Sequence, residues 1–114
     1  NLTSILQAIS SLESQNVGRR IAILGEMLEL GEQSVRSHQT TLNACQDFDR
    51  VITVGNQFRD CQTDIGQDHY QQAQAIDIER LAKWLRPGDT VLVKGSNAVF
   101  WNSGFVSRLK AVLA

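Results

Sequence analysis

The sequence has 114 residues and a mass of 12.7 kDa, with 42% hydrophobic and 20% charged residues, which is typical of one globular domain. Eleven basic and twelve acidic residues give a net charge of −1, so a surface dedicated to nucleic acid is not expected. The longest apolar runs, Ile21–Leu24 and Val91–Val93, are far shorter than the roughly 20 residues of a membrane-spanning helix. These numbers exclude a second domain and a helical membrane span.

The cysteines and the first residues indicate the cellular compartment and the relation of the chain to a longer protein. Cys45 and Cys61 form neither a C-x-x-C pair nor a zinc-ligand pattern, so we expect reduced thiols, no bound metal and a cytoplasmic location. No secretory signal pattern opens the sequence. The first residue is Asn1 rather than methionine, and we expect the chain to be a segment of a longer protein.

The first half of the chain predicts a helix, a strand and a second helix. Apolar residues recur with helical spacing from Ile5 to about Gln15, with Thr3 or Ser4 as the N-cap. The run Arg19–Gly25 predicts a strand buried on both faces, followed by a structured loop over Gly25–Gly31.

A polar helix is expected over Glu32–Cys45. Val35, Leu42 and Cys45 would form its thin apolar stripe, with His38 near the same face. The β-branched run Val51–Gly55 then predicts the second strand.

The segment 56–74 has the weakest pattern, and we expect a short helix over Phe58–Cys61 and a weak edge strand over His69–Gln71. The later elements are a helix over Ile76–Leu85, a strand over Thr90–Ser96 that enters a glycine turn, and a helix over Phe105–Leu113. Phe100, Phe105, Trp84 and Trp101 are expected in the core, although Phe100 and Trp101 are also placed to wall a pocket.

The alternation of helices and strands predicts a single α/β domain over residues 1–114, a three-layer Rossmann-like fold whose mainly parallel sheet is flanked by helices. Functional groups in such sheets gather at the carboxyl ends of the strands. This rule selects three loops: Gly25–Gly31, Gly55–Phe58 and Lys94–Ala98.

Two of these loops carry charged groups that suit ligand binding. Lys94, Gly95 and Ser96 place an ammonium group, an unobstructed backbone and a hydroxyl at one strand end, where they can bind a carboxylate or a phosphate. The residues before Lys94 do not form a Walker A loop. A strand-capping turn with a solvated lysine explains the same residues.

Glu26 and Glu29 can accept hydrogen bonds from an ammonium group or orient a metal, although a solvated acidic loop is the simpler interpretation. His38 follows on the next helix and can reach back to this loop, or it can serve only in packing. Neither cysteine nor any serine lies in a nucleophile motif, so hydrolase chemistry is not supported.

The string from Gly18 to Gly31, with His38 behind it, closely resembles the carboxyl-terminal domain of the Mur ligases, and within that family the members that add D-alanyl-D-alanine. Asn1-Leu2-Thr3-Ser4, the strand from Asp49 to Gly55, and Val91–Ser96 resemble further family segments in the same order. The resemblance therefore covers essentially the whole chain.

The resemblance implies an ATP-dependent, amide-forming ligase of peptidoglycan synthesis that acts on a UDP-muramoyl tripeptide. In the family, ATP and Mg²⁺ are bound mainly by a central domain, the nucleotide-sugar contacts lie in an amino-terminal domain, and no catalytic residue is expected in this domain. The carboxyl-terminal domain closes over ATP and supplies the pocket for the incoming amino component, so the isolated domain is expected to be inactive.

The resemblance also assigns roles to residues. It implies that Lys94 and Ser96 bind the dipeptide carboxylate, and that Glu26 or Glu29 receives the ammonium group. Asn1 and Thr3 would lie at the hinge beside the nucleotide, with His38 as a supporting residue. The full set implied for the substrate pocket is Glu26, Met27, Glu29, Lys94, Gly95, Ser96 and Asn97.

Three positions depart from the family pattern: Leu2 replaces a proline, Glu26 replaces an aspartate, and Asn97–Trp101 replaces an Arg-Gly-Met-Arg-like stretch. Two alternatives therefore stay open. One is a Rossmann-like binding domain without ligase activity, and the other is a ligase of the same superfamily that adds a different amino acid.

Overall fold

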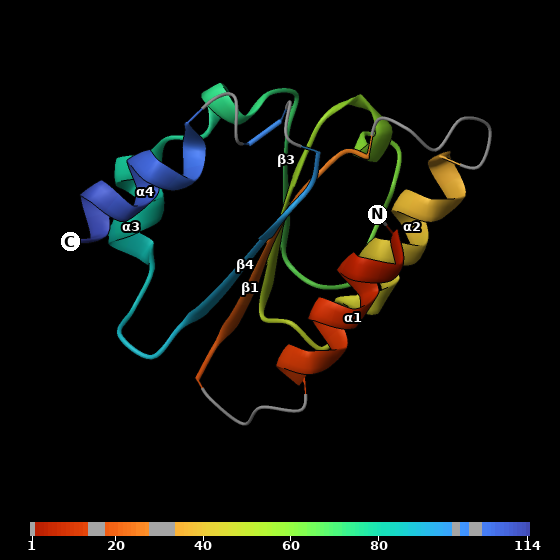
Figure 1. Ribbon diagram of the computed structural model, residues 1–114, viewed down its shortest axis with the longest axis horizontal. Coiled ribbons are helices and arrows are strands. Elements are labelled where there is room, and N and C mark those ends of the chain that lie inside the picture. Colours follow the sequence, from red (N-terminus) through yellow and green to blue (C-terminus); the bar gives the residue numbers. More distant parts are fainter. Residues whose placement is uncertain (1, 14–17, 28–33, 97–98, 101–103) are drawn as a thin grey trace.

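The computed structural model describes residues 2–13, 18–27, 34–96, 99–100 and 104–114. Four parallel strands form one sheet in the order β3-β2-β1-β4. Helices α1 and α2 cover one face and α3 and α4 cover the other, so the domain has three layers (Figure 1). The predicted α/β fold class with a parallel sheet is confirmed.

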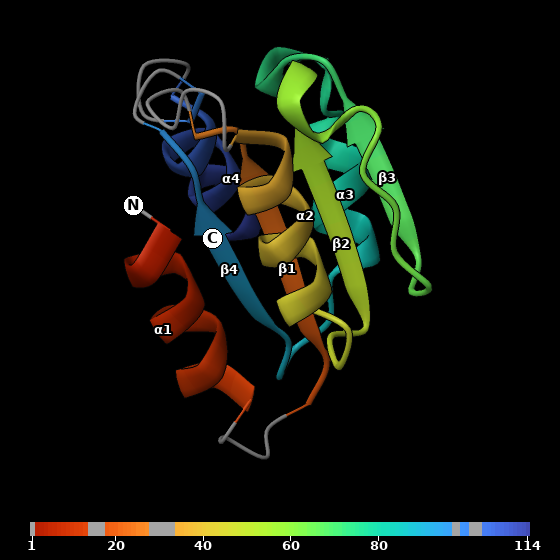
Figure 2. The same cartoon turned by 90° about the vertical axis from the view of Figure 1, so that its right-hand side faces the viewer.

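The elements, in chain order, are α1 (Leu2–Glu13), β1 (Arg20–Gly25), α2 (Ser34–Ala44), β2 (Arg50–Val54), the 3₁₀ turn η2 (Asn56–Phe58), β3 (Gln67–Tyr70), the 3₁₀ turn η3 (Ala73–Ala75), α3 (Ile78–Trp84), β4 (Thr90–Lys94) and α4 (Phe105–Leu113). Figure 2 shows α1 and α2 in front of the sheet, with β1 in the interior between β4 and β2.

The interior strand β1 has alternating side chains in two separate cores. Ala22 and Leu24 face α1 and α2, whereas Ile21 and Ile23 face α3 and α4, and all four are at most 1% exposed. An apolar run buried on both faces is what a central parallel strand requires. This confirms the prediction made from the apolar run alone.

The start of α1 differs from the prediction. The helix already includes Leu2, so Thr3 and Ser4 lie in its first turn and neither is the N-cap. Leu2 packs against the core formed by Ile5 and Ile9, and this contact extends the helix toward the amino terminus.

The buried face of α2 also differs from the predicted stripe. Val35 is 63% exposed, while Ser34, Ser37, His38 and Thr41 are buried together with Leu42. Polar groups can take this face because their hydrogen bonds are satisfied inside; the Thr41 hydroxyl, for example, donates to the Ser37 carbonyl at 2.9 Å. Of the predicted stripe, only Val35 therefore lies on the exposed side, whereas Leu42, Cys45 and the neighbouring His38 are buried as predicted.

The weakly patterned segment contains the two predicted elements with shifted bounds. The short helix is η2, which begins two residues before the predicted Phe58, and the edge strand β3 likewise begins two residues before His69. Its polar side chains have cross-strand partners: Asp68 pairs with Arg50, and His69 Nδ1 lies 2.9 Å from the Thr53 hydroxyl. These pairs explain how a polar sequence forms a strand.

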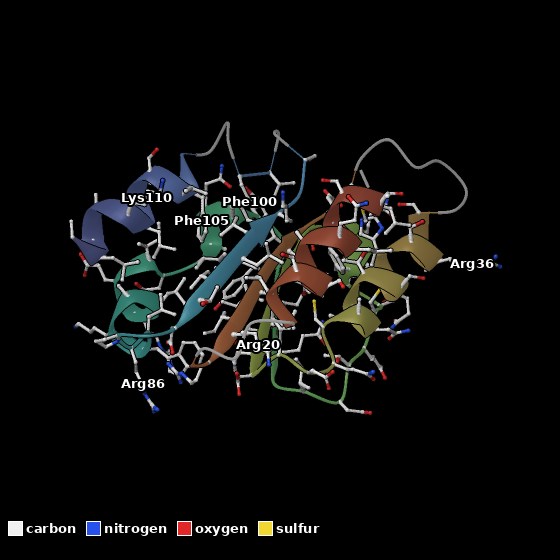
Figure 3. The ribbon with its side chains drawn as sticks, turned by 60° about the horizontal axis from the view of Figure 1, so that its bottom comes forward. Arg20, Arg36, Arg86, Phe100, Phe105 and Lys110 are labelled. Atoms are coloured by element: carbon white, nitrogen blue, oxygen red, sulfur yellow. The ribbon has the colours of Figure 1, made fainter. Side chains whose placement is uncertain are left out.

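Trp84 is not a core residue as predicted. It is 39% exposed, and the Arg19 guanidinium lies over its ring at 4.2 Å. Phe100 and Phe105 are buried in the α3/α4 core, with ring centroids 5.4 Å apart. Both side chains are labelled in Figure 3. Trp101 lies outside the described residues.

Candidate binding site at the carboxyl ends of the strands

The carboxyl ends of β1, β2 and β4 are joined by backbone hydrogen bonds around Glu26. The Glu26 amide donates to the Val54 carbonyl at 2.9 Å, and the Glu26 carbonyl accepts from the Ser96 amide at 3.2 Å. Two of the predicted loops, those that carry Glu26 and Ser96, are therefore in direct contact. Residue 26 is fixed between the ends of the two strands that flank β1.

The side chain of Glu26 is also held in place, because its Oε2 accepts a hydrogen bond from the backbone amide of Gln57 at 3.1 Å. Gly55 makes this arrangement possible: its φ is +109°, and a Cβ there would lie 2.5 Å from Glu26 Cδ. The carboxylate lies across the glycine that ends β2. All three loops selected from the sequence thus meet at one residue, Glu26: the loop after β2 contacts its side chain, and the loop after β4 contacts its backbone carbonyl.

Gly95 permits a second close approach. A Cβ at Gly95 would lie 2.8 Å from the Gly25 Cα, so the turns after β4 and β1 touch through backbone atoms. The backbone after Lys94 therefore has no room for a side chain and stays against the β1 turn.

Lys94 is the last residue of β4, and Ser96 lies two residues further along the chain. Within the part of the chain that the structure describes, Lys94 makes no ion pair. The Ser96 hydroxyl is shielded from solvent and has no hydrogen-bond partner among the described residues. A buried hydroxyl without a partner is unfavourable unless another group supplies the missing bond. Considering the described residues alone, the strand end thus offers an ammonium group without an ion pair and a hydroxyl without a hydrogen-bond partner.

A hollow of ≈ 250 Å³ lies beside Glu26, over the ends of β2 and β3. The carboxylate, Val99 and three primary amides line it, and no described basic side chain does. Its full lining is Glu26, Val54, Gly55, Gln71, Gln72, Ala73, Gln74 and Val99. Sequence reasoning missed the three glutamines; the only signal for them is that they follow β3 at the carboxyl edge of the sheet.

His38 contacts the Glu26 loop from α2. Its Nε2 accepts a hydrogen bond from the Met27 amide at 2.9 Å, and its Nδ1 contacts the Ser34 carbonyl. The ring is fully buried and lies edge-on to Phe58, with centroids 4.7 Å apart.

The structure brings together most of the predicted site. Glu26, Lys94, Gly95 and Ser96 lie at the carboxyl edge, and Met27 is buried behind Glu26. Thr3 is on the exposed side of α1. Asn1, Glu29 and Asn97 lie outside the described residues.

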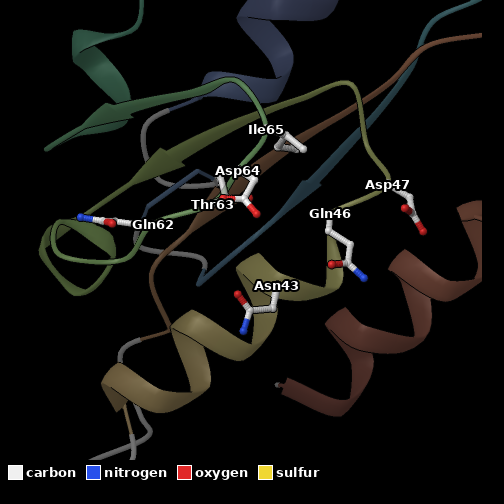
Figure 4. A pocket seen from close by; sticks show the side chains of 7 residues that line it. All are labelled: Asn43, Gln46, Asp47, Gln62, Thr63, Asp64 and Ile65. Carbon is white, nitrogen blue, oxygen red and sulfur yellow. The ribbon is translucent and has the colours of Figure 1, made fainter.

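A second hollow, of ≈ 340 Å³, lies between the end of α2 and the segment before β3 (Figure 4). Its lining is Asn43, Gln46, Asp47, Gln62, Thr63, Asp64 and Ile65. Because it adjoins the amino ends of β2 and β3, it lies opposite the edge that carries Glu26 and Lys94. It does not contribute to the candidate site.

The described residues offer neither a metal site nor an exposed thiol. These residues contain no group of three His, Cys, Asp or Glu side chains able to hold a metal ion. Cys45 and Cys61 are both buried free thiols, and burial raises the pKa of the Cys61 thiol. No helix among the same residues is long and apolar enough to cross a membrane.

Comparison with known proteins identifies related sequences and folds. The family described as Mur ligase, glutamate ligase domain, matches residues 1–97. The fold is similar to that of MurF ligase from Thermotoga maritima, solved in complex with ADP, with a TM-score of 0.82 and 23% identity. The match covers 99% of this chain and 26% of that protein, so the chain spans about a quarter of the ligase's length.

Proposed function

Because the chain belongs to the Mur ligase, glutamate ligase domain family, we propose that it is the carboxyl-terminal domain of an ATP-dependent ligase of peptidoglycan synthesis. The proposed ligase acts in the cytoplasm and joins D-alanyl-D-alanine to a UDP-muramoyl tripeptide. In this proposal the domain binds the amino component and presents its amine to the activated carboxylate of the tripeptide.

The observation that carries the proposal is the pair of unsatisfied groups at the end of β4. Lys94 has no ion pair and the Ser96 hydroxyl has no hydrogen-bond partner among the described residues. A carboxylate accepts hydrogen bonds from both an ammonium group and a hydroxyl, and such charge-assisted bonds are among the strongest that proteins make. The carboxylate of a dipeptide would supply both partners.

Glu26 is the complementary group for the other end of the dipeptide. Its carboxylate is fixed by the Gln57 amide and faces the hollow between β2 and β3. An ammonium group beside it would be attracted by its charge, and the amides of Gln71 and Gln72 would surround the first residue of the ligand. Glu29 and Asn97 would complete the pocket.

The role of this arrangement in the reaction is positional. ATP would activate the tripeptide carboxylate by phosphorylation, and the amine of the dipeptide would then form the amide bond as phosphate leaves. Following the resemblance to the family, the proposal places Mg²⁺ and most of the ATP contacts in a central domain outside this chain. Asn1 and Thr3 would lie at the hinge to that domain. Holding the amine in line is a large part of such catalysis.

Calorimetric titration of the chain with D-alanyl-D-alanine tests the proposal. We expect weak, saturable binding that is absent with L-alanyl-L-alanine. Lys94→Ala should weaken it by about tenfold or more, because a charge-assisted hydrogen bond is lost. Lys110→Ala is the matched control, since this exposed lysine lies on α4 (Figure 3). Equal binding of both enantiomers, or no effect of Lys94→Ala, would overturn the assignment.

An assay of amide formation separates the ligase from a binding domain that lacks activity. The longer protein that carries this chain should form the amide from ATP, UDP-muramoyl tripeptide and D-alanyl-D-alanine, and Lys94→Ala should reduce the rate. Dipeptide binding without amide formation would instead favour the binding-domain alternative.

A further inference from the structure

We propose that His38 is the positioning residue that holds the Glu26 carboxylate in place, a role that rests on the proposed function of Glu26. His38 lies on α2, while Glu26 follows β1 and is held by a residue that follows β2. The imidazole contacts Met27, the residue after Glu26, and Phe58, the residue after Gln57. It therefore supports both the backbone that carries the carboxylate and the amide that donates to it.

The first support is the backbone of residue 27. The Met27 amide donates to His38 Nε2 at 2.9 Å, and both residues are buried. Met27 is adjacent to Glu26, whose own amide donates to the Val54 carbonyl. Two successive amides are thus fixed by partners on different elements, which restricts the backbone from which the Glu26 side chain extends.

The second support is the 3₁₀ turn η2. The Gln57 amide donates to Glu26 Oε2, and the next residue, Phe58, is fully buried with its ring against His38 at 4.7 Å. The edge-to-face contact fixes the position of Phe58 and thereby of the neighbouring amide. His38 thus supports the donor as well as the acceptor of this hydrogen bond.

The contacts require one tautomer of the imidazole. A backbone carbonyl can only accept, so the Nδ1 atom that contacts the Ser34 carbonyl carries the proton. Nε2 is then the unprotonated nitrogen that accepts from Met27. A ring protonated on both nitrogens, or on Nε2 alone, would lose the Met27 bond.

Two substitutions separate the contacts of His38. In His38→Gln, the amide oxygen lies as many bonds from Cβ as Nε2 does, so it can still accept from Met27. In His38→Asn, the shorter amide can donate to the Ser34 carbonyl, as Nδ1 does, but cannot reach Met27. Both variants lose the ring contact with Phe58. Because His38→Asn keeps the Ser34 contact, a greater loss in His38→Asn than in His38→Gln reports the Met27 bond.

Amide hydrogen exchange and dipeptide titration of the chain form the test. We expect His38→Asn to speed exchange of the Met27 amide at least tenfold relative to His38→Gln, and to bind D-alanyl-D-alanine about three- to tenfold more weakly, the effect of one lost hydrogen bond. Equal exchange and equal affinity of the two variants would overturn the proposal. Absence of dipeptide binding by the unsubstituted chain would instead overturn the proposed function, and the exchange result would still report the Met27 bond.

A measurement on the unsubstituted chain covers the case in which His38→Asn fails to fold. Nitrogen-15 spectra distinguish protonated from unprotonated ring nitrogens. The proposal predicts a protonated Nδ1 and an unprotonated Nε2 coupled to the Met27 amide proton. A proton on Nε2 would overturn it.

Discussion

The two ends of the parallel strands, which form an amino edge and a carboxyl edge of the sheet, differ in how completely their polar groups are paired. At the amino edge, Arg19 donates two hydrogen bonds to Asp89 and one to the Trp84 carbonyl, and Asp49 accepts from the Arg20 amide at 2.8 Å. At the carboxyl edge, Lys94 has no ion pair and the Ser96 hydroxyl no partner among the described residues.

The difference separates stability from binding within one small domain. Paired charges at the amino edge tie the start of β1 to the turn before β4. At the carboxyl edge, Lys94 and the Ser96 hydroxyl have no such partners among the described residues, and we expect them to contribute to binding rather than to the fold. We therefore expect substitutions of the polar side chains at the two edges to affect different measurements, whereas the backbone contact at Gly95 affects stability.

The largest effect on stability is expected at the close approach of backbones on the carboxyl edge. Gly95→Ala would place a Cβ 2.8 Å from the Gly25 Cα, and overpacking of this kind lowers the free energy of unfolding by about 1–3 kcal/mol. Urea denaturation measures the loss. Lys94→Ala, one residue earlier, is the control: its half-buried side chain makes no ion pair among the described residues, and we expect a smaller loss of stability than for Gly95→Ala.

The next largest effect is expected on the affinity for the dipeptide, in a variant that should leave the stability of the fold unchanged. Glu26→Gln keeps the size of the side chain and an oxygen that can accept from the Gln57 amide, but removes the charge. We expect the affinity for D-alanyl-D-alanine to fall about tenfold, because the ammonium group loses a charge-assisted bond. Glu79→Gln on α3 is the matched control. Comparable losses of affinity in Glu26→Gln and Glu79→Gln would show that Glu26 does not bind the ammonium group specifically.

The amino edge should respond in the opposite way. Asp89→Asn weakens the contacts with Arg19 and should lower stability by less than Gly95→Ala does, while dipeptide affinity stays unchanged. Thermal denaturation and calorimetry measure the two quantities. A loss of affinity with an intact fold would contradict the separation of the edges.

The effect of Asp89 should also depend on pH. The hydrogen bonds from Arg19 lower the pKa of Asp89 below its ordinary value of 3.8. A carboxyl group whose pKa is lowered by folding stabilises the protein above its unfolded pKa, and this contribution is lost as the pH falls through the folded pKa. The stability difference between the parent chain and Asp89→Asn should therefore be constant near neutral pH and shrink in acid below about pH 4.

The smallest effect concerns the cysteines. Cys61 is 5% exposed and its pKa is raised by burial, so its thiol should react slowly with iodoacetamide in the folded chain. Labelling should speed up in urea as the segment opens. Rapid labelling of Cys61 in the native chain would show that the segment before β3 opens far more often than the buried contact implies.

Much of the fold could be predicted because periodicity and burial agree in these elements. Ile21 and Ile23 lie in a run that only a buried strand explains, and Phe105 and Leu109 have helical spacing in α4. The burial of α2 could be predicted only in part: Leu42 and His38 lie on the expected face, whereas Thr41 is buried through a hydrogen-bond partner that apolar spacing does not reveal. Trp84 was misplaced for a related reason: Arg19, far away in sequence, covers its ring.

The candidate site was predictable in part from topology. Parallel strands bring their carboxyl ends to one edge, which places Glu26, Gly55 and Ser96 together once the strands are known. The glutamines beside the hollow were missed because Gln71–Gln74 shows no chemical pattern until β3 is placed next to β2. The bond between His38 and Met27 likewise exists only in the folded chain.

The most direct test of the central claim is a residue-by-residue map of chemical-shift changes on adding D-alanyl-D-alanine to the chain. The account predicts saturable changes at the amides of Glu26, Gln57 and Ser96, and none at Arg19 or Asp89 on the amino edge. Changes centred on the amino edge, or spread evenly over the sheet, would contradict it.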